Sequence, residues 1–339
     1  MNKKKIILLV ISIFFLAFAF ALRLKAGSIN ISFSEIIAYF TTGELSNVKI
    51  NIMNLRFHRV ILVILVGAGL SISGATYQGA LRNMLADPFI LGVSSGAALF
   101  SAIGMTYEVS PLTMLGLVDE FSVTRDLPIM AFLGSMISIS ILMLIYRCNP
   151  SSLLTIILGG VAINSFLSAS LTLIMYYSKN LRNIYSWLLG SFEISSTSVG
   201  TIQITGIIII VCTIYLIWKS SILNIMLLDE RVSASLGINV EYFRLKFIIV
   251  SSIIVAVVVS VSGMIGFIGL LVPHGARFII GADNRYLLPF SFILGGAVLA
   301  ICDALAHTLI SGIIIPVGVI TSFIGAPFFI YLLVRRSNI

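Results

Sequence analysis

The residues best suited to chemistry by type and spacing lie in strongly apolar surroundings. Asp303 falls inside a long apolar stretch, and His307 follows four residues later. That spacing places both side chains on one face of a helix. A carboxylate in such a stretch is costly to bury, so it is a candidate proton or cation site. The alternative is a structural hydrogen bond from Asp303 to His307 or to the backbone, and the sequence leaves both open.

Two arginines, Arg56 and Arg59, lie at the outer mouth of the second long apolar stretch, where we expect them to be exposed. Because they are three residues apart, they share one helix face. Paired guanidinium groups at the mouth of an apolar segment suit a partner that carries carboxylates. Ordinary anchoring of both side chains at a membrane interface is the alternative. A similar pair, His274 and Arg277, is interpreted as packing and inner-interface residues.

The sequence carries no signature of catalysis. It has no Walker A glycine loop and no pattern of a nucleophile with a base. Cys148, Cys212 and Cys302 occur singly in apolar context, without the spacing of a metal site or a disulfide framework. We therefore expect no enzyme activity, no cofactor and no metal in this chain. The net charge of +8 resides in short loops, so it indicates membrane orientation rather than nucleic-acid binding.

Composition fixes the class of protein. The 339 residues are 59% hydrophobic and 10% charged, whereas soluble domains carry about 25% charged residues. Mean hydropathy is +1.12, and apolar stretches of about 17–25 residues, each long enough to span a bilayer, recur throughout. We expect a single all-α membrane domain with about ten spans, at 6–24, 57–80, 89–107, 128–147, 152–177, 199–218, 245–263, 265–281, 289–308 and 314–334.

The basic residues predict the orientation. With the amino terminus inside, 13 of the 21 basic residues fall on the cytoplasmic side, so both termini are expected in the cytoplasm. The first span resembles a signal peptide, but its apolar run exceeds the usual 7–15 residues, and we expect a retained helix. The cytoplasmic set is Lys3, Lys4, Lys5, Arg82, Arg147, Lys219, Arg231, Arg244, Lys246, Arg277, Arg285, Arg335 and Arg336.

Ten spans divide into two halves of opposite orientation, at about 1–180 and 181–339. Ser73-Gly74 and Ser262-Gly263 are a weak echo of an inverted repeat. Between two spans of the second half, about residues 220–240 form a polar, helix-compatible cytoplasmic segment. Such a segment suits the docking of a separate motor protein. The residues expected to couple there are Asp229, Glu230, Ala234, Leu236 and Gly237.

The chain resembles the permease subunit of the bacterial ABC importers for ferric siderophores, heme and cobalamin. The resemblance covers about residues 50–335, and no one motif in it is unusual, whereas the set is specific. Its stretches are Leu55 to Arg59, Val66 to Gly74, Gln78, Arg82 to Pro88, Leu91 to Ala97, Trp187 to Phe192, Asp229 to Gly237, Gly266 to His274, Arg277, Pro316 to Gly318 and Gly325 to Phe329.

The resemblance implies a dimer of ten-span subunits, paired with itself or with a paralogue. It also implies two cytoplasmic ATPase subunits, which hold ATP and magnesium, and an extracellular substrate-binding protein. Arg56 and Arg59 match arginines that bind glutamates of that protein, and 150–177 and 314–334 match helices that line the pathway. Structural or gating roles are expected for Asn83, Pro88, Pro273, Asp303 and Pro316.

Three positions depart from the family pattern. His58 replaces a proline, His307 replaces an arginine four residues after the aspartate, and Ile315 replaces a glutamate. If His307 is the third docking cation, its charge would vary with pH near 6.5. By analogy, we expect the protein in the bacterial plasma membrane. The favoured cargo is an iron–siderophore complex, with heme or cobalamin as the alternative. The rival hypothesis from another class is an ion-coupled transporter that uses Asp303. An intramembrane enzyme would need a convergent group of polar residues, which this sequence lacks.

Overall fold

The computed structural model describes residues 3–27, 29, 31–41, 46–148, 153–192, 199–228, 230–310 and 313–336. Within these ranges every regular element is a helix, and no strand occurs. In chain order they are α1 (Lys3–Lys25), α2 (Phe33–Thr41), α3 (Asn47–Ala80), η1 (Pro88–Leu91), α4 (Val93–Tyr107), α5 (Pro111–Met114), α6 (Val123–Cys148), α7 (Leu153–Tyr177), α8 (Leu181–Leu188), α9 (Val199–Trp218), α10 (Ser220–Met226), α11 (Glu230–Ser235), α12 (Val240–Ser262), α13 (Ile268–Ile280), α14 (Asn284–Thr308) and α15 (Val317–Arg336).

In the described part of the chain, seven helices are long and apolar enough to cross a membrane, and they are α1, α3, α6, α7, α9, α12 and α14. A helix needs about 20 apolar residues to cross the hydrocarbon core, and each of the seven meets that requirement. The prediction of an all-α, multi-pass membrane protein is therefore confirmed.

The predicted number of ten spans is not confirmed. The helices at the predicted ranges 89–107, 265–281 and 314–334 are α4, α13 and α15, and none of them is among the seven. Because α13 has 13 residues, it is about 20 Å long at 1.5 Å per residue, against a core of about 30 Å. Backbone turns bound two of these helices: Gly92 (φ 80°) separates η1 from α4, and α13 lies between Phe267 (φ 69°) and Gly281 (φ 90°).

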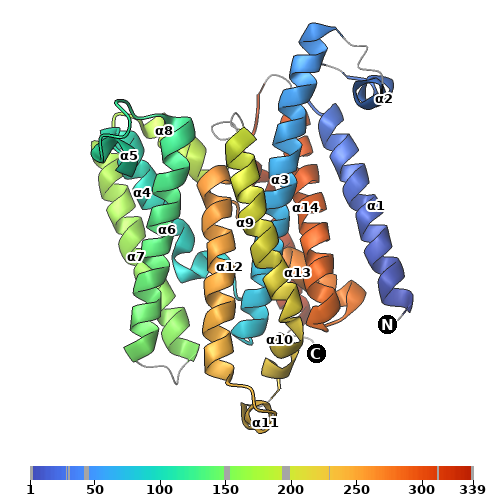
Figure 1. The fold of residues 1–339 in the computed structure, drawn as a ribbon, viewed down its shortest axis with the longest axis vertical. Coiled ribbons are helices and arrows are strands. Elements are labelled where there is room, and N and C mark those ends of the chain that lie inside the picture. The colour runs from blue at the N-terminus through green and yellow to red at the C-terminus, as the bar shows by residue number, and fades with distance from the viewer. Residues whose placement is uncertain are drawn as a thin grey trace.

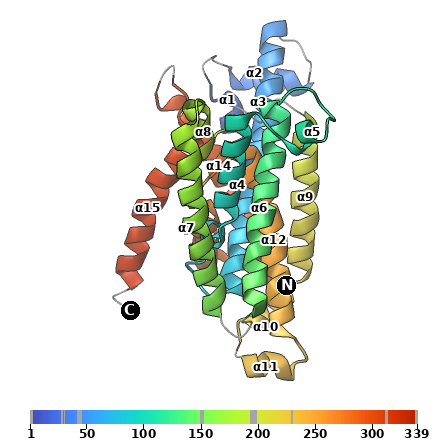
Figure 2. The same cartoon turned by 90° about the vertical axis from the view of Figure 1, so that its left-hand side faces the viewer.

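Helix α3 lies at the centre of the bundle (Figures 1 and 2), in contact with α1, α9, α12, α13 and α14. Nearly all of its residues from Val60 to Ala80 are buried. Glycines allow the close contacts: a Cβ on Gly67 would overlap the carbonyl oxygen of Gly295 in α14, and one on Gly74 would overlap that of Gly269 in α13. Small residues hold membrane helices together in this way.

The bundle has two distinct ends. Figures 1 and 2 show α2, α5 and α8 at one end, here the upper end, whereas α10, α11 and both ends of the chain lie at the lower end. The predicted polar segment at about 220–240 thus contains two short helices, α10 and α11, that lie below the bundle. Their coupling role stays a prediction.

The two Ser-Gly pairs that suggested an inverted repeat have different structural roles. Ser73-Gly74 lies inside α3, which continues to Ala80, whereas Ser262-Gly263 forms the end of α12. The similarity of the two pairs in sequence therefore does not extend to their local structure. The division into inverted halves stays a prediction without that support.

Candidate functional site

Asp303 is the centre of a charged cluster near the upper end of α1, α3 and α14. Its carboxylate is fully buried. Arg23 of α1 donates a hydrogen bond from Nε to Oδ2 of Asp303, and Arg59 of α3 donates from Nη2 to Oδ1 over 3.1 Å. Two guanidinium groups thus enclose one carboxylate, and the cluster keeps an excess of one positive charge.

Sequence reasoning missed Arg23, the partner that makes burial of Asp303 affordable. A charge removed from water is tolerated when it is paired and hydrogen-bonded. The sequence offered only a general indication of this partner. A buried carboxylate requires a cation, and Arg23 is a basic residue in the last turn of the first apolar helix. The sequence could not select Arg23 among the other basic residues of that side.

Arg56 does not occupy the exposed position that the sequence suggested. Its side chain is buried, and its guanidinium donates to the carbonyl oxygens of Leu24 (3.0 Å), Lys25 (3.1 Å) and Ile29 (2.8 Å). The last carbonyls of a helix have no partner within that helix, so Arg56 caps the end of α1. The expectation that Arg56 is exposed is wrong, and its docking role is now an untested prediction that requires this cap to open.

Arg59 remains the reachable member of the predicted pair. Its side chain is 14% exposed, and its guanidinium lies 5.9 Å from the ring centre of Phe192. His58, which stands where the family pattern has a proline, is half-buried and makes a 2.7 Å contact from Nδ1 to the carbonyl of Asn54. A docking role for Arg59 agrees with this placement and stays a prediction.

His307 contacts Asp303 mainly through the backbone. Its Nδ1 donates to the carbonyl oxygen of Asp303 over 2.8 Å and lies 3.8 Å from the carboxylate oxygen Oδ1. The carboxylate itself is engaged by Arg23 and Arg59. The expected Asp303–His307 hydrogen bond is therefore a helical contact to a carbonyl, and the role of His307 as a docking cation stays a prediction.

At the lower end, polar side chains hold α10 against α3 and α14. Arg82, which follows α3 in a left-handed backbone conformation (φ 48°), donates to the carbonyl oxygens of Met226 and Leu228 over 2.7 Å each. Met226 is the last residue of α10 and Leu228 lies two residues beyond it, where helical partners are missing. Arg82 thereby connects the end of α3 to the start of the α10–α11 connection.

Asn224 makes the matching connection to α14. Its Nδ2 donates to Asp283 over 2.7 Å, and its Oδ1 accepts from the backbone N–H of Asn284 over 2.8 Å. Arg285 also donates to Asp283, over 2.8 Å. These hydrogen bonds hold the pKa of the Asp283 carboxyl well below its usual range, with Arg285 as the largest cause. Helix α10 is thus attached to both central helices, α3 and α14.

The predicted coupling residues lie on or beside α11. Asp229 is outside the described residues, and Glu230 and Ala234 are described by their helical backbone alone. Leu236 is 58% exposed. Gly237 has a φ of 75°, and no atom lies within 4 Å of the position of an added Cβ. This part of the lower end is therefore open, and it presents an apolar side chain.

The predicted gating residues are dispersed through the fold. Asn83 closes the turn after α3, where its Oδ1 accepts from the N–H of Leu85 over 2.9 Å. Pro88 begins η1, Pro273 lies inside α13, and Pro316 directly precedes α15. The structure does not bring these four into one site with Asp303, and their gating roles stay predictions. In the described ranges no three His, Cys, Asp or Glu side chains converge as metal ligands.

Comparison with known proteins supports one family. The chain is 34% identical to the hemin transport system permease protein HmuU of Yersinia pestis, over 92% of this chain and 90% of that protein. It is 35% identical to the vitamin B12 import system permease protein BtuC of Vibrio parahaemolyticus, over 85% and 83%. A solved inward-facing structure assigned to the metal-chelate type of ABC transporter has a TM-score of 0.81 at 28% identity, over 97% of this chain and 99% of that one.

The family profile agrees with these relatives over most of the chain. It matches residues 15–335, which include Arg23, Arg59, Asp303 and the α10–α11 region. The match extends beyond the stretch from about 50 to 335 on which the resemblance in sequence rests. This chain belongs to the FecCD transport family.

Proposed function

We propose that this chain is the membrane permease subunit of an ATP-driven importer, which receives a bulky metal chelate from an extracellular binding protein. Membership of a transport family and a bundle of membrane-spanning helices support this proposal. The carrying observation is the attachment of α10 to both α3 and α14 through Arg82 and Asn224. A motor that moves α10 and α11 would act directly on the centre of the bundle.

The proposed mechanism is transmission of movement through rigid contacts. Closure of two cytoplasmic ATPase subunits, which hold ATP and magnesium, would displace α11 and α10. Arg82 and Asn224 would pass this displacement to α3 and α14, which also contact each other closely at Gly67. A tilt of this central pair would open the pathway to one side at a time, as in other rigid-body transitions. No chemical step is required of this chain.

The proposed assembly contains a second permease subunit. Helix α7 is apolar yet exposes large side chains along its length, including Phe166, Leu173 and Tyr176. Helix α15 exposes Phe323 and Ile324. A pathway between two subunits, lined by 150–177 and 314–334, would give these faces a partner. We propose a bacterial plasma-membrane location with the lower end in the cytoplasm, so that both termini, α10 and α11 face the ATPase.

The cargo is proposed as a class of compounds. Ferric siderophores are our first candidate, and the relatives named for hemin and vitamin B12 favour heme and cobalamin equally. All three are large metal chelates. The rival proposal, an ion-coupled transporter with Asp303 as its proton or cation site, has weaker support because Arg23 and Arg59 already neutralise that carboxylate.

The test is uptake into vesicles that contain the purified permease with its ATPase. Ferric siderophore, hemin and cobalamin are supplied in turn with the cognate binding protein. We expect uptake of one chelate that requires ATP and the binding protein, and that persists when the proton gradient is dissipated. Uptake without ATP that follows the proton gradient would support the Asp303 transporter instead.

A further inference from the structure

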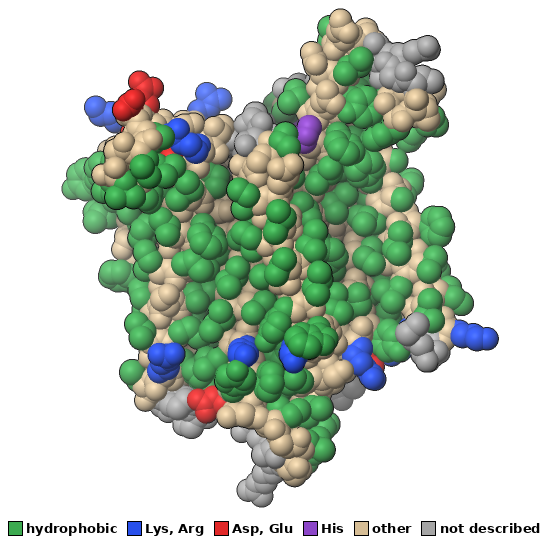
Figure 3. Space-filling model, in the orientation of Figure 1, with side chains coloured by type: hydrophobic (Ala, Val, Ile, Leu, Met, Phe, Trp, Pro, Cys, Tyr) green, Lys and Arg blue, Asp and Glu red, His purple; other side chains and the backbone are tan. Residues whose placement is uncertain are grey.

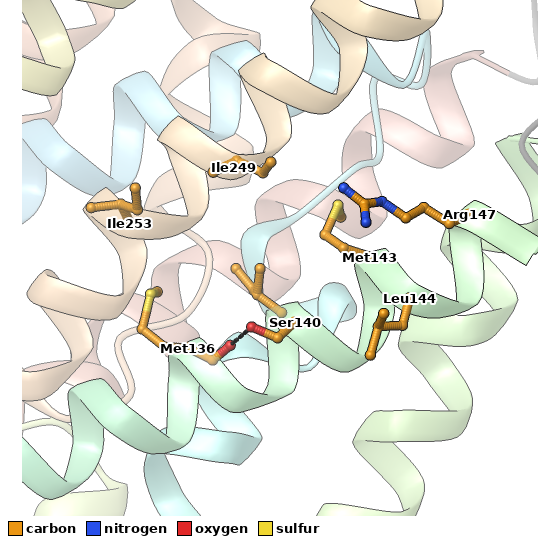
Figure 4. A pocket seen from close by; sticks show the side chains of 8 residues that line it. Met136, Ser140, Met143, Leu144, Arg147, Ile249 and Ile253 are labelled. Atoms are coloured by element: carbon orange, nitrogen blue, oxygen red, sulfur yellow. Dashed lines mark hydrogen bonds between the residues drawn. The ribbon is translucent and has the colours of Figure 1, made fainter.

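A groove between α6 and α12 lies outside every contact used so far. Its volume is about 370 Å³, and its walls come from Met136, Ile139, Ser140, Met143, Leu144, Arg147, Ile249 and Ile253. Figure 4 shows the α6 side chains in order along one wall, Ile249 and Ile253 on the other, and Arg147 beyond Met143 at one end. The volume lies within the range of small-molecule sites.

The walls of the groove away from Arg147 present apolar groups, even though Ser140 is among the lining residues. The hydroxyl of Ser140 donates to the carbonyl oxygen of Met136 over 2.7 Å, so it is occupied within its own helix. Two of the lining residues, Met136 and Met143, are flexible and adapt to irregular apolar ligands. Leu144 is 60% exposed. Such a surface on a membrane helix is suited to a hydrocarbon chain.

Positive charge gathers at the lower end of the groove. Arg147 is in the last turn of α6 and is exposed. On the antiparallel helix α12, Lys246 precedes Ile249 by three residues and therefore shares its face. The Lys246 ammonium lies 4.3 Å from the ring centre of Tyr242, one turn further down. Glu241, the acidic residue of this turn, lies about 100° around the helix from Tyr242 and therefore faces a different direction from the Tyr242 ring.

The surface view shows the same arrangement on a larger scale. In Figure 3 the face that carries α6 and α12 is mostly hydrophobic, and blue basic side chains form a row near its lower edge. Basic residues at this depth attract the anionic headgroups of the cytoplasmic leaflet, by about 1 kcal/mol each. Arginine adds specificity because its guanidinium binds phosphate through two parallel hydrogen bonds.

We propose that the groove binds one anionic phospholipid, with an acyl chain against Met143 and Leu144 and the phosphate between Arg147 and Lys246. The apolar wall selects a molecule with a hydrocarbon chain, and the two cations select a negative headgroup. Free phosphate would satisfy only the second requirement. A zwitterionic lipid would satisfy only the first, because its own positive charge opposes both side chains.

The experiment measures lipid retained by the full-length chain. The protein is purified from vesicles of phosphatidylcholine with a minority of phosphatidylglycerol, delipidated in steps, and its bound lipids are identified by native mass spectrometry. We expect the wild type to retain phosphatidylglycerol. Arg147→Gln and Lys246→Gln should each reduce the preference for phosphatidylglycerol about fivefold, and the double variant should reduce it about 30-fold, since one basic residue contributes about that factor.

Two further variants separate the groove from general surface charge. Lys219→Gln removes a basic residue whose ammonium lies over the Trp218 ring and which does not line the groove, so lipid retention should not change. Ser140→Trp fills the groove while Arg147 and Lys246 remain, and retention should be lost. Because Ser140→Trp keeps both charges, it tests the proposal even if the double glutamine variant unfolds.

Other occupants give other results. Displacement of phosphatidylglycerol by millimolar inorganic phosphate would identify a simple anion site and overturn the proposal. In a Cys148→Ser background, a disulfide between two copies of Leu144→Cys would show that a second permease covers this face, which also overturns it. Equal retention of phosphatidylglycerol by the wild type and the double glutamine variant would do the same.

Discussion

Arg23 near the end of α1 and Asp303 near the end of α14 form a buried ion pair across 280 positions of the chain. Arg59 of α3 occupies the other side of the same carboxylate. The cluster therefore connects α1, α3 and α14 at one point near the upper end of the bundle. Asp303 is the only anion within this cluster of described residues, so both arginines depend on it.

The first prediction concerns loss of that anion. If Asp303 made only a hydrogen bond to its own helix, Asp303→Asn would leave transport largely intact, because the amide keeps the capacity to form hydrogen bonds. The structure predicts otherwise: Asp303→Asn leaves Arg23 buried without a counter-charge, and breaking a buried pair costs about 3–5 kcal/mol. Thermal unfolding of the purified variant should occur at a clearly lower temperature.

The double variant supplies the control. Arg23→Gln with Asp303→Asn removes the buried charge together with its partner, and Arg59 is partly exposed, so much of the lost stability should return. Glu35→Gln, which removes a partly exposed pair with Lys49, should change little. A stability of Asp303→Asn equal to that of the wild type would contradict the structural role of the cluster.

The second prediction concerns docking of the binding protein at Arg59. Because Arg56 caps α1, the informative change is Arg59→Glu alone rather than reversal of both charges. Like charges facing each other across an interface can cost several kcal/mol, so association with the binding protein should weaken, most clearly at low salt. Surface binding at two ionic strengths measures this effect.

Two matched variants show whether the effect belongs to that position. Arg182→Glu reverses another arginine near the upper end, on α8, and should leave association nearly unchanged. Arg59→Gln removes the charge without adding repulsion toward Asp303, and should weaken association less than Arg59→Glu. Unaltered affinity in Arg59→Glu, with the variant folded, would remove the docking role from Arg59.

Local patterns in the sequence were sufficient for the long helices and for the 220–240 segment, but they did not predict the short helices α2, α5 and α8. Hydropathy located the long helices, and the polar composition of 220–240 located α10 and α11. Hydropathy could not decide how many helices cross the membrane, because the backbone turns at Gly92, Phe267 and Gly281 shorten α4 and α13. Those conformations depend on tertiary contacts, which a hydropathy window does not contain.

Contacts between distant residues explain what the sequence did not show. Arg23 and Arg59 are both basic residues near one end of an apolar stretch, and nothing local distinguishes the buried partner of Asp303 from a docking cation. Arg56 lies about one helical turn before Arg59, yet it caps a different helix, because α1 ends at Leu24 and Lys25 beside the Arg56 side chain. Helical spacing predicted a shared face but not which partner each side chain would meet.

The third prediction concerns Asp87 in the connection between α3 and α4. Its Oδ1 accepts from the N–H of Phe89 over 2.8 Å at the start of η1. Burial raises the pKa of this carboxyl from 3.8 to about 6. The folded protein then binds a proton that the unfolded chain has lost, so stability should fall as pH rises from about 4 to about 6.

The matched variant is Asp87→Asn, which can still accept the hydrogen bond but cannot ionise. Between pH 4 and pH 7 the wild type should lose stability relative to this variant, and the loss should level off above about pH 6. Chemical denaturation in detergent at several pH values measures the difference. Parallel curves for the two proteins would show that Asp87 does not titrate in this window.

The last prediction concerns Gly237, beside α11 at the lower end. An added Cβ would meet no atom of the described residues within 4 Å, so we expect Gly237→Trp to fold, apart from the strain of a φ of 75°. In the proposed complex the same surface faces the ATPase, and a large ring would prevent close contact. Uptake and ATPase copurification should both fall, whereas Gly237→Asn, a residue that tolerates this backbone conformation, should stay near the wild type. Gly116→Trp is the matched control, since Gly116 has a φ of 65° and equally open surroundings beside α5 at the upper end. Equal losses in both tryptophan variants would assign the effect to backbone strain, and normal uptake with Gly237→Trp would remove this surface from the coupling path.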